Sequence, residues 1–287
     1  RLNRYAYCPF GFFAEHILKL EPIEEPEEGM DALQRGSLLH AVLERFNREM
    51  VRESLRYESS HEEELLGLVE KHCRLVFIKA PRRYGFRPGP LWHYEQREME
   101  RMLKIMVSWE CSQNGEKARY RPFKLEAGFG LRGQDPIQVR DPLASFSMRG
   151  LIDRLDRDEQ GYLRVIDYKS GRGKFSKSDL ESGTALQTAL YALAADQLWG
   201  DGEGKVRESY YLHIPSRETS GKLTFEGPVT EDEQAGRIIH QAAYSVDRVR
   251  KGIFPSAPAK SIWGKWSCQS QCDFRSLCRV SRQSVIK

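Results

Sequence analysis

The sequence lacks any apolar run that approaches the length of a membrane span, and no signal peptide opens it. These absences predict a cytoplasmic protein with no membrane partner. Internal repeats and low-complexity segments are also missing, which excludes solenoid and fibrous architectures. The first residue is Arg rather than Met, so we expect the chain to be a piece of a longer protein.

A nucleotide-binding phosphate loop is missing as well. The segment from Gly171 to Lys174 contains two glycines and a lysine, but it lacks the Walker spacing. The chain itself is therefore not expected to bind ATP in that way. Its 287 residues are 40% hydrophobic and 30% charged, with a net charge of +4. This mildly basic balance permits a nucleic-acid partner without requiring one.

Cysteine is sparse, with six residues in the chain. Disulfide-rich proteins are usually short and secreted, and such a low cysteine content in a long chain does not suggest that class. Cys268, Cys272 and Cys278 fall within eleven residues, and this clustering favours metal ligation in a reducing compartment. Cys73 and Cys111 fall in predicted helices and are expected to be buried small hydrophobic residues.

Hydrophobic periodicity predicts an α/β protein in which helices precede a block of strands. We expect one domain over 1–287, with a helical part at about 1–120, a sheet core at about 121–215, and a C-terminal helix with the cysteine cluster at about 228–287. The predicted helices are 1–20, 32–50, 60–79, 91–113, 185–199 and 230–251, and the predicted strands outside a central hairpin are 122–131 and 207–214. Residues 81–90 are predicted to form a loop.

The central hairpin is predicted from two strand-like stretches, Gly150-Leu-Ile-Asp-Arg-Leu-Asp and Val165-Ile-Asp-Tyr-Lys-Ser-Gly, joined by a turn that ends at Gly161. If Asp158 pairs with Tyr162, counting back along both arms places Asp153 opposite Asp167. Opposed carboxylates repel each other, so such a pair indicates a bound cation or a shared proton.

Lys169 lies two residues beyond Asp167 and therefore projects from the same strand face. Two acids and a lysine on one face are typical of a Mg²⁺- or Mn²⁺-dependent site that cleaves phosphodiesters. Asp153 and Asp167 would bind the metal, the backbone carbonyl of Tyr168 would add a ligand, and Lys169 would position water or stabilise the transition state. The alternative is that both acids are surface residues paired with Arg154 and Lys169.

The two hairpin motifs resemble those of the PD-(D/E)XK nuclease superfamily, and specifically its RecB-like branch. Gly36-Ser-Leu-Leu-His40 is similar to the upstream Gly-x-x-x-His motif of that branch, and Gln187-Thr-Ala-Leu-Tyr191 is similar to its Gln-x-x-x-Tyr motif. The resemblance implies a restriction-endonuclease-like core, with a central mixed sheet flanked by helices and a helical insertion. It also implies that His40 is a metal ligand and that Gln187 and Tyr191 hold DNA.

The cysteines extend the resemblance to AddB-type members that carry a 4Fe–4S cluster, in which one cysteine lies near the start and three near the end. Cys8, Cys268, Cys272 and Cys278 follow this plan, and thiolates are the expected ligands of such a cluster. Three residues separate Cys268 from Cys272, where the branch often has two. Zinc at the same four cysteines therefore stays an alternative.

Together these patterns predict a DNA nuclease, with an exonuclease acting on single-stranded ends as the expected type, in DNA repair or recombination. A helicase subunit, or a helicase-like region of a longer chain, is the expected partner. Basic residues interleaved with aromatic ones, Arg154 among them, are predicted to track the DNA strand. The alternatives are a nuclease-inactive iron–sulfur subunit that binds DNA, and a structural protein that is held together by zinc and has no nucleic-acid role.

Overall fold

The computed structural model describes residues 2–21, 30–113, 119–131, 133–256 and 272–278. A mixed five-stranded sheet in the order β1-β4-β5-β6-β7 forms its centre, and β2 pairs with β3 in a separate two-stranded sheet. The strands are β1 (Arg121–Phe129), β2 (Ile137–Val139), β3 (Phe146–Met148), β4 (Gly150–Arg157), β5 (Leu163–Lys169), β6 (Val206–His213) and β7 (Glu218–Thr224). Only the β5–β6 pair of the large sheet is parallel, and the predicted mixed sheet is confirmed.

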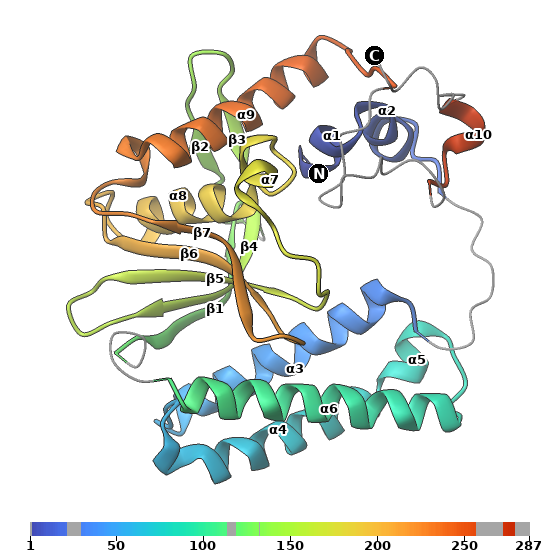
Figure 1. Ribbon diagram of the computed structural model, residues 1–287, viewed down its shortest axis with the longest axis vertical. Helices are drawn as coiled ribbons and strands as arrows, with labels where there is room; N and C mark the ends of the chain where they lie inside the picture. Colours follow the sequence, from blue (N-terminus) through green and yellow to red (C-terminus); the bar gives the residue numbers. More distant parts are fainter. Residues whose placement is uncertain (1, 22–29, 114–118, 132, 257–271, 279–287) are drawn as a thin grey trace.

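Helices cover both faces of this sheet, so the protein has three layers (Figure 1). One layer contains α3 (Ala32–Arg52), α4 (Glu62–Phe77), α5 (Ala80–Tyr84) and α6 (Pro90–Cys111), and the other contains α7 (Lys177–Glu181), α8 (Gln187–Trp199) and α9 (Glu233–Arg250). Each layer has its own apolar core against the sheet. Among the described residues, none of the helices is both long and apolar enough to cross a bilayer.

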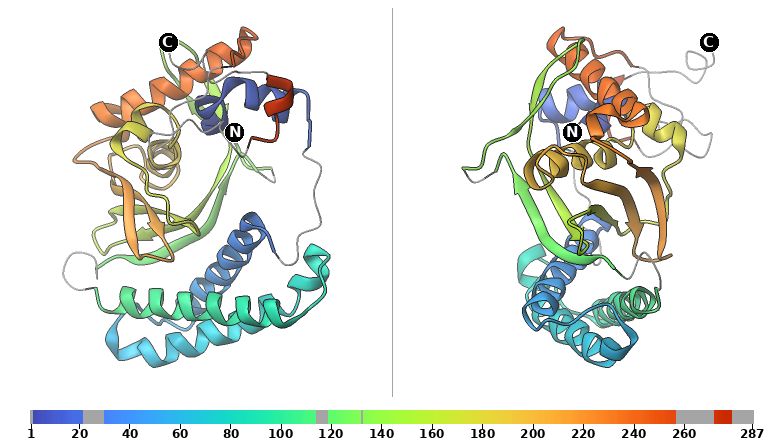
Figure 2. Two further views of the ribbon diagram at one scale, coloured as in Figure 1. Left: turned by 45° about the vertical axis from the view of Figure 1, so that its right-hand side comes forward. Right: turned by 90° about the vertical axis from the view of Figure 1, so that its left-hand side faces the viewer.

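The beginning and the end of the described chain lie side by side. The short helices α1 (Leu2–Tyr7), α2 (Pro9–Phe12) and α10 (Arg275–Cys278), together with a π-helical turn at Phe13–Ile17, gather at the end of the molecule next to α9 (Figures 1 and 2). The hydroxyl of Tyr5 donates a hydrogen bond of 2.6 Å to the carbonyl of Ile253, which follows α9. Two short 3₁₀ turns, Ser59–His61 and Val229–Glu231, complete the elements.

The predicted hairpin is confirmed as β4 and β5. The amide of Asp158 donates to the carbonyl of Tyr162 at 3.0 Å, and the side chain of Asp158 accepts from the amides of Gln160 and Tyr162. Gly161 adopts a φ of 86°, a left-handed conformation that glycine reaches without strain. Turn chemistry at a single aspartate therefore fixes the register of the two strands.

Several elements differ from the expectations. The predicted loop at 81–90 begins with α5, and the N-terminal helix predicted over 1–20 is divided into α1, α2 and the π-helical turn. Arg149 separates β4, which joins the main sheet, from β3, a short strand that pairs with β2. The edge strand β7 and the short helix α7 were not predicted, because polar and glycine residues interrupt their apolar patterns.

A buried ionic network joins the helical layer to the sheet. Arg154 donates two hydrogen bonds to Asp156, at 2.6 and 2.8 Å, and one of 2.8 Å to Glu110 of α6. Arg164 donates to the same Asp156 carboxylate at 2.7 Å. The predicted DNA contact of Arg154 is corrected here, because its side chain is only 1% exposed and its guanidinium is already ion-paired.

We expect Asp156→Asn to lower the free energy of unfolding by about 3–5 kcal/mol, because it leaves two buried arginines without their shared counter-ion. Burial raises the pKa of Asp156, but Arg154 and Arg164 outweigh burial and hold this pKa below its usual value. The carboxylate therefore stabilises the fold at neutral pH, and this contribution is lost as the pH falls through the lowered pKa.

Urea denaturation of the two proteins measures this difference. The matched control is Glu218→Gln, which removes one charge from the half-exposed pair with Lys174 and is expected to leave the stability nearly unchanged, because solvent screens exposed ion pairs. Equal stabilities of the Asp156 and Glu218 variants would contradict the assigned role of the network.

Candidate catalytic and metal site

Three carboxylates lie on three neighbouring strands. The register of the β1–β4 pair places Glu126 of β1 opposite Asp153 of β4. The register of the β4–β5 pair, continued by one residue beyond Arg154, places Asp167 of β5 on the other side of Asp153. The backbone amide of Tyr168 donates to Asp153 Oδ2 at 2.7 Å and anchors it. The opposition of Asp153 and Asp167 predicted from the turn is therefore confirmed.

His40 reaches this row of acids from α3. Its Nδ1 lies 3.3 Å from Asp153 Oδ1, and ligand atoms of His40, Glu126 and Asp153 all lie within 4.8 Å of one another. A metal-binding role for Glu126 was not predicted, although its strand was. The sequence feature that could have indicated this role is an acidic residue in a strand next to the predicted catalytic hairpin.

Gly36 explains why α3 comes so close to the site. A Cβ at this position would approach the Ser170 hydroxyl oxygen to 3.0 Å, which is tighter than ordinary van der Waals contact. Ser170 directly follows Lys169, the last residue of β5. Because glycine leaves room there, the helix packs against the end of the strand, and His40, one helical turn further, meets Asp153.

Lys169 lies at the other side of Asp167 and is held by two acceptors. Its Nζ is 2.5 Å from Asp167 Oδ2 and donates to Gln187 Oε1 at 2.9 Å. The amide nitrogen of Gln187 donates in turn to Asp167 Oδ1 at 3.1 Å and to the Tyr191 hydroxyl at 3.4 Å. The four residues therefore form one connected cluster in which Gln187 fixes the orientation of both charged groups.

The acids of the cluster are not surface groups. Asp167 is 4% exposed, so the alternative of two solvated surface acids is contradicted. Burial raises the pKa of Asp167 to about 6, although Lys169 opposes this shift. Burial and the nearby charges of Asp153 and Glu44 raise the pKa of Glu126 to about 7. Burial lowers the pKa of His40, but the hydrogen bond and charge of Asp153 outweigh it and leave this pKa above its usual value.

Glu126 also carries backbone strain. Its φ is 46°, a left-handed conformation that costs a residue with a side chain about 1–2 kcal/mol. The distortion lies in a strand that already contains an irregularity between Pro122 and Lys124. Such outliers persist where the surrounding structure enforces them, and they concentrate at functional sites. The strained backbone directs a third carboxylate toward Asp153.

The residues present fit a divalent metal ion. Repelling carboxylates with raised pKa values gain stability from a cation, and carboxylate oxygens with an imidazole are competent ligands for Mg²⁺ or Mn²⁺. Asp153, Glu126 and His40 would hold the ion directly, and Asp167 lies beside them. Metal ligation by Asp167 and by the backbone carbonyl of Tyr168 stays a prediction.

The cysteine site is described in part. Cys8 is buried, and Cys272 and Cys278 are half-buried. Burial is the main cause of the raised pKa of Cys8, and the neighbouring Cys278 and Cys272 raise it further, so the three residues lie near one another. Cys8 Sγ also accepts a hydrogen bond of 3.3 Å from the amide of Gly11. Cys268 lies outside the described residues.

The fold and the site define a class of α/β proteins in which the central strands present acids and a lysine to one face, the arrangement typical of metal-dependent hydrolases. A family profile described as the PD-(D/E)XK nuclease superfamily matches residues 1–279. The chain therefore belongs to the PD-(D/E)XK nuclease superfamily.

Curated relatives agree with this assignment, and the three described here are all named as subunits of an ATP-dependent helicase/deoxyribonuclease. The chain is 28% identical over 99% of its length to the protein of Clostridioides difficile, of which it covers 26%. It is 32% identical over 67% of its length to the protein of Alkaliphilus metalliredigens, of which it covers 17%. The protein of Heliobacterium modesticaldum is 27% identical over the whole chain, which covers 26% of that relative. The chain thus spans about a quarter or less of these relatives.

We expect Mn²⁺ binding to release protons near neutral pH, because a ligand with a pKa of about 7 holds a proton part of the time and must lose it to bind metal. Affinity should therefore rise with pH until Glu126 is fully ionised. Titration calorimetry in two buffers of different ionisation enthalpy counts the protons released, and we expect more at pH 6.5 than at pH 8.5.

The control for this titration is Glu126→Gln, which keeps the size of the side chain and removes its proton chemistry. It should release fewer protons at pH 6.5 and bind Mn²⁺ at least about tenfold more weakly, since even residues that only support metal ligands contribute this much. Unchanged affinity and proton release would exclude Glu126 from the metal site.

Proposed function

We propose that this chain is a metal-dependent nuclease unit that hydrolyses DNA phosphodiesters as part of a larger helicase–nuclease. The observation that carries the proposal is the single cluster formed by His40, Glu126, Asp153, Asp167 and Lys169, in which each group is placed by an identifiable backbone or side-chain contact. Membership of the nuclease superfamily and the names of the relatives support it.

The residues would divide the chemistry in the following way. A metal ion at His40, Glu126 and Asp153 would lower the pKa of a water ligand and neutralise charge on the phosphate. Asp167 holds Lys169 at 2.5 Å, which positions the ammonium group to orient the attacking water or to stabilise the developing oxyanion. Gln187 contacts both groups and keeps them aligned with each other.

A groove beside this cluster supports a DNA strand as the substrate. A cavity of about 880 Å³ is lined by Gln187, Tyr191 and mostly apolar side chains of β3, β4 and the N-terminal helix. Gly150 lies in its wall, where a Cβ would collide with the Phe129 ring at 2.7 Å and press on Tyr191 at 3.1 Å. The glycine therefore keeps Tyr191 in place. Apolar walls suit unpaired bases, so a single-stranded end is the proposed substrate.

A 4Fe–4S cluster at Cys8, Cys268, Cys272 and Cys278 is the second part of the proposal. The proximity of Cys8 to Cys272 and Cys278 supports it, because residues from opposite ends of the chain meet there. A cluster would join these two distant segments, and closing so long a loop would stabilise the domain. Zinc is the alternative metal for the same thiolates.

We expect Lys169→Ala to lower the rate of Mn²⁺-dependent cleavage of single-stranded DNA about 10²- to 10³-fold, the range found when one charge-stabilising donor is removed. DNA affinity should change less than about threefold, because many contacts share the binding. Single-turnover cleavage of end-labelled DNA and a binding titration in Ca²⁺ measure the two quantities.

The matched control is Lys251→Ala, since this exposed lysine also pairs with an acid, Asp247, but lies at the end of α9. It should cleave like the unaltered protein. If the unaltered protein binds DNA but does not cleave it, the chain is a nuclease-inactive DNA-binding subunit. If it shows no salt-dependent DNA binding at all, a structural protein held together by zinc is favoured.

We expect the anaerobically purified protein to show the broad brown visible absorption of a 4Fe–4S cluster, and Cys8→Ser to lose it because one thiolate ligand is removed. Cys73→Ser is the matched control, since Cys73 is buried in α4 away from the chain ends. A colourless protein that contains zinc would contradict the iron–sulfur assignment and leave the nuclease assignment untouched.

A further inference from the structure

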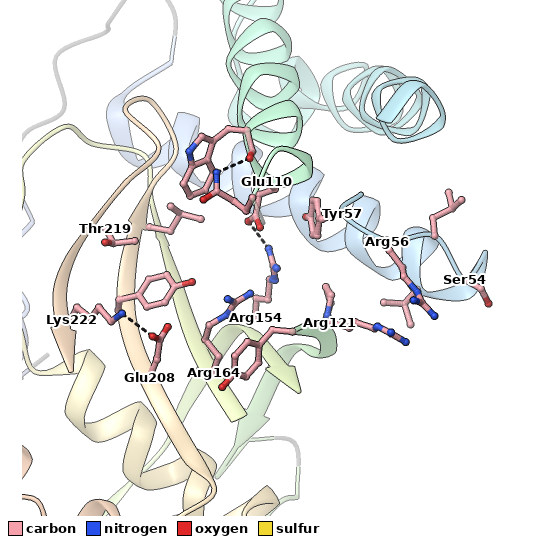
Figure 3. Close-up of a pocket in the computed structure, with 18 residues that line it drawn as sticks. Ser54, Arg56, Tyr57, Glu110, Arg121, Arg154, Arg164, Glu208, Thr219 and Lys222 are labelled. Atoms are coloured by element: carbon pink, nitrogen blue, oxygen red, sulfur yellow. Dashed lines mark hydrogen bonds and ion pairs between the residues drawn. The ribbon is translucent and has the colours of Figure 1, made fainter. Parts of the chain in front are cut away.

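A second cavity lies between the helical layer and the sheet, away from the catalytic cluster. It has a volume of about 280 Å³ and opens among the C-terminal ends of α3 and α6, the start of β1, and strands β4 to β7 (Figure 3). Arg164 near the beginning of β5 lines it, whereas Lys169 at the end of β5 serves the catalytic site. None of the side chains assigned above to metal binding or catalysis lines this cavity.

The lining is rich in cationic side chains, all of which are ion-paired. Five cations face the cavity, namely Arg56, Arg121, Arg154, Arg164 and Lys222. Lys222 pairs with Glu208, Arg154 and Arg164 share Asp156, and Arg56 and Arg121 each pair with an exposed acid. Figure 3 shows Lys222 and Glu208 on one wall, Arg56 and Tyr57 on the opposite wall, and Arg154 and Arg164 between them. A guanidinium carries five N–H donors, so a paired arginine can still donate to the oxygen atoms of a ligand such as a phosphate.

Arg164 is the residue that indicates most specifically that the cavity binds a ligand. The residue is 4% exposed, and its guanidinium donates to Asp156 and stacks 4.5 Å from the Tyr120 ring. Its Nε is buried and has no hydrogen-bond acceptor among the described residues. A buried donor without an acceptor costs about 1–3 kcal/mol, which an oxygen atom of a ligand would recover. Arg154, in contrast, is already paired with Asp156 and Glu110.

The remaining lining suggests more than a bare anion. Trp109, Tyr210 and Leu212 provide apolar and aromatic surface, and Glu110, Gln113 and Thr219 provide hydrogen-bonding groups. The cavity volume lies close to the lower end of the roughly 300–1,000 Å³ that is typical of small-molecule sites. It is much larger than one phosphate group, and arginine is the preferred partner of phosphate oxygens.

We infer that this cavity binds a nucleoside phosphate, with the phosphate at Arg164 and the nucleoside against Trp109 and Tyr210. The inference does not depend on the proposed nuclease activity, because the two sites share no assigned side chain. Two sources offer the same chemistry, a free nucleotide and the phosphorylated 5′ end of a DNA strand.

The test is a binding titration of dAMP, followed by tryptophan fluorescence and by calorimetry, with EDTA present so that the metal site does not contribute. We expect saturable binding of one dAMP per chain, with inorganic phosphate at least tenfold weaker. Competition by a 5′-phosphorylated oligonucleotide, but not by its 5′-hydroxyl counterpart, would identify the DNA end as the source. Competition by neither would identify the free nucleotide.

Two variants locate the binding. Arg164→Lys keeps the buried charge but removes the Nε donor, and Thr219→Trp fills the cavity from the exposed surface of β7 without removing a charge. Each should weaken dAMP binding at least tenfold. Arg237→Ala, on the exposed face of α9 where Arg237 pairs with Glu233, should leave it unchanged, and circular dichroism verifies that all variants fold.

No saturable dAMP binding at millimolar concentration would overturn the inference. Binding that survives Thr219→Trp would also overturn it, even if Arg164→Lys proves unstable. Inorganic phosphate that binds as tightly as dAMP would contradict the assignment of a nucleoside to the apolar wall.

Discussion

The hydrogen-bonded register of β1, β4 and β5 holds the carboxylates of Glu126, Asp153 and Asp167 side by side, although their charges repel one another. The rest of the site depends on this constraint. A strand slip of one residue would turn every side chain to the other face and disperse the acids. The turn at Asp158 and Gly161 fixes one of the two pairings. The other includes the left-handed backbone of Glu126, so part of the stability of the sheet is used to maintain a strained and electrostatically unfavourable arrangement.

The helical layer contributes to the site in two ways. It brings His40 to Asp153 through the close approach of α3 at Gly36. It also anchors the same strands through the buried contacts of Glu110 with Arg154, whose guanidinium donates to the Tyr168 hydroxyl at 3.1 Å. The amide of Tyr168 binds Asp153. The side chain of Tyr168 therefore contacts the ionic network, and its backbone amide contacts the candidate metal site. One face of the hairpin stabilises the fold, and the other presents the catalytic groups.

Local patterns were sufficient to predict the hairpin, the opposition of its two acids and the position of Lys169, because strand periodicity and turn chemistry act over a few residues. Family resemblance added His40, Gln187 and Tyr191, which the structure places beside those acids. Glu126 was missed because its position depends on the pairing of β1 with β4 and on a positive φ, neither of which has a local signature. Arg154 was misassigned because its burial depends on Glu110, which α6 brings to the sheet from 44 residues earlier in the sequence. In each failure the deciding contact joins residues distant in the sequence.

The central claim is that Glu126, Asp153 and His40 hold one divalent metal ion beside Asp167 and Lys169. Anomalous diffraction from crystals soaked in Mn²⁺ tests it most directly, because the signal locates the ion without assuming its ligands. The account predicts a single strong peak within about 2.5 Å of ligand atoms from His40, Glu126 and Asp153, in the range of metal–oxygen and metal–nitrogen bonds. A peak elsewhere, or no peak at a Mn²⁺ concentration that supports cleavage, would contradict it.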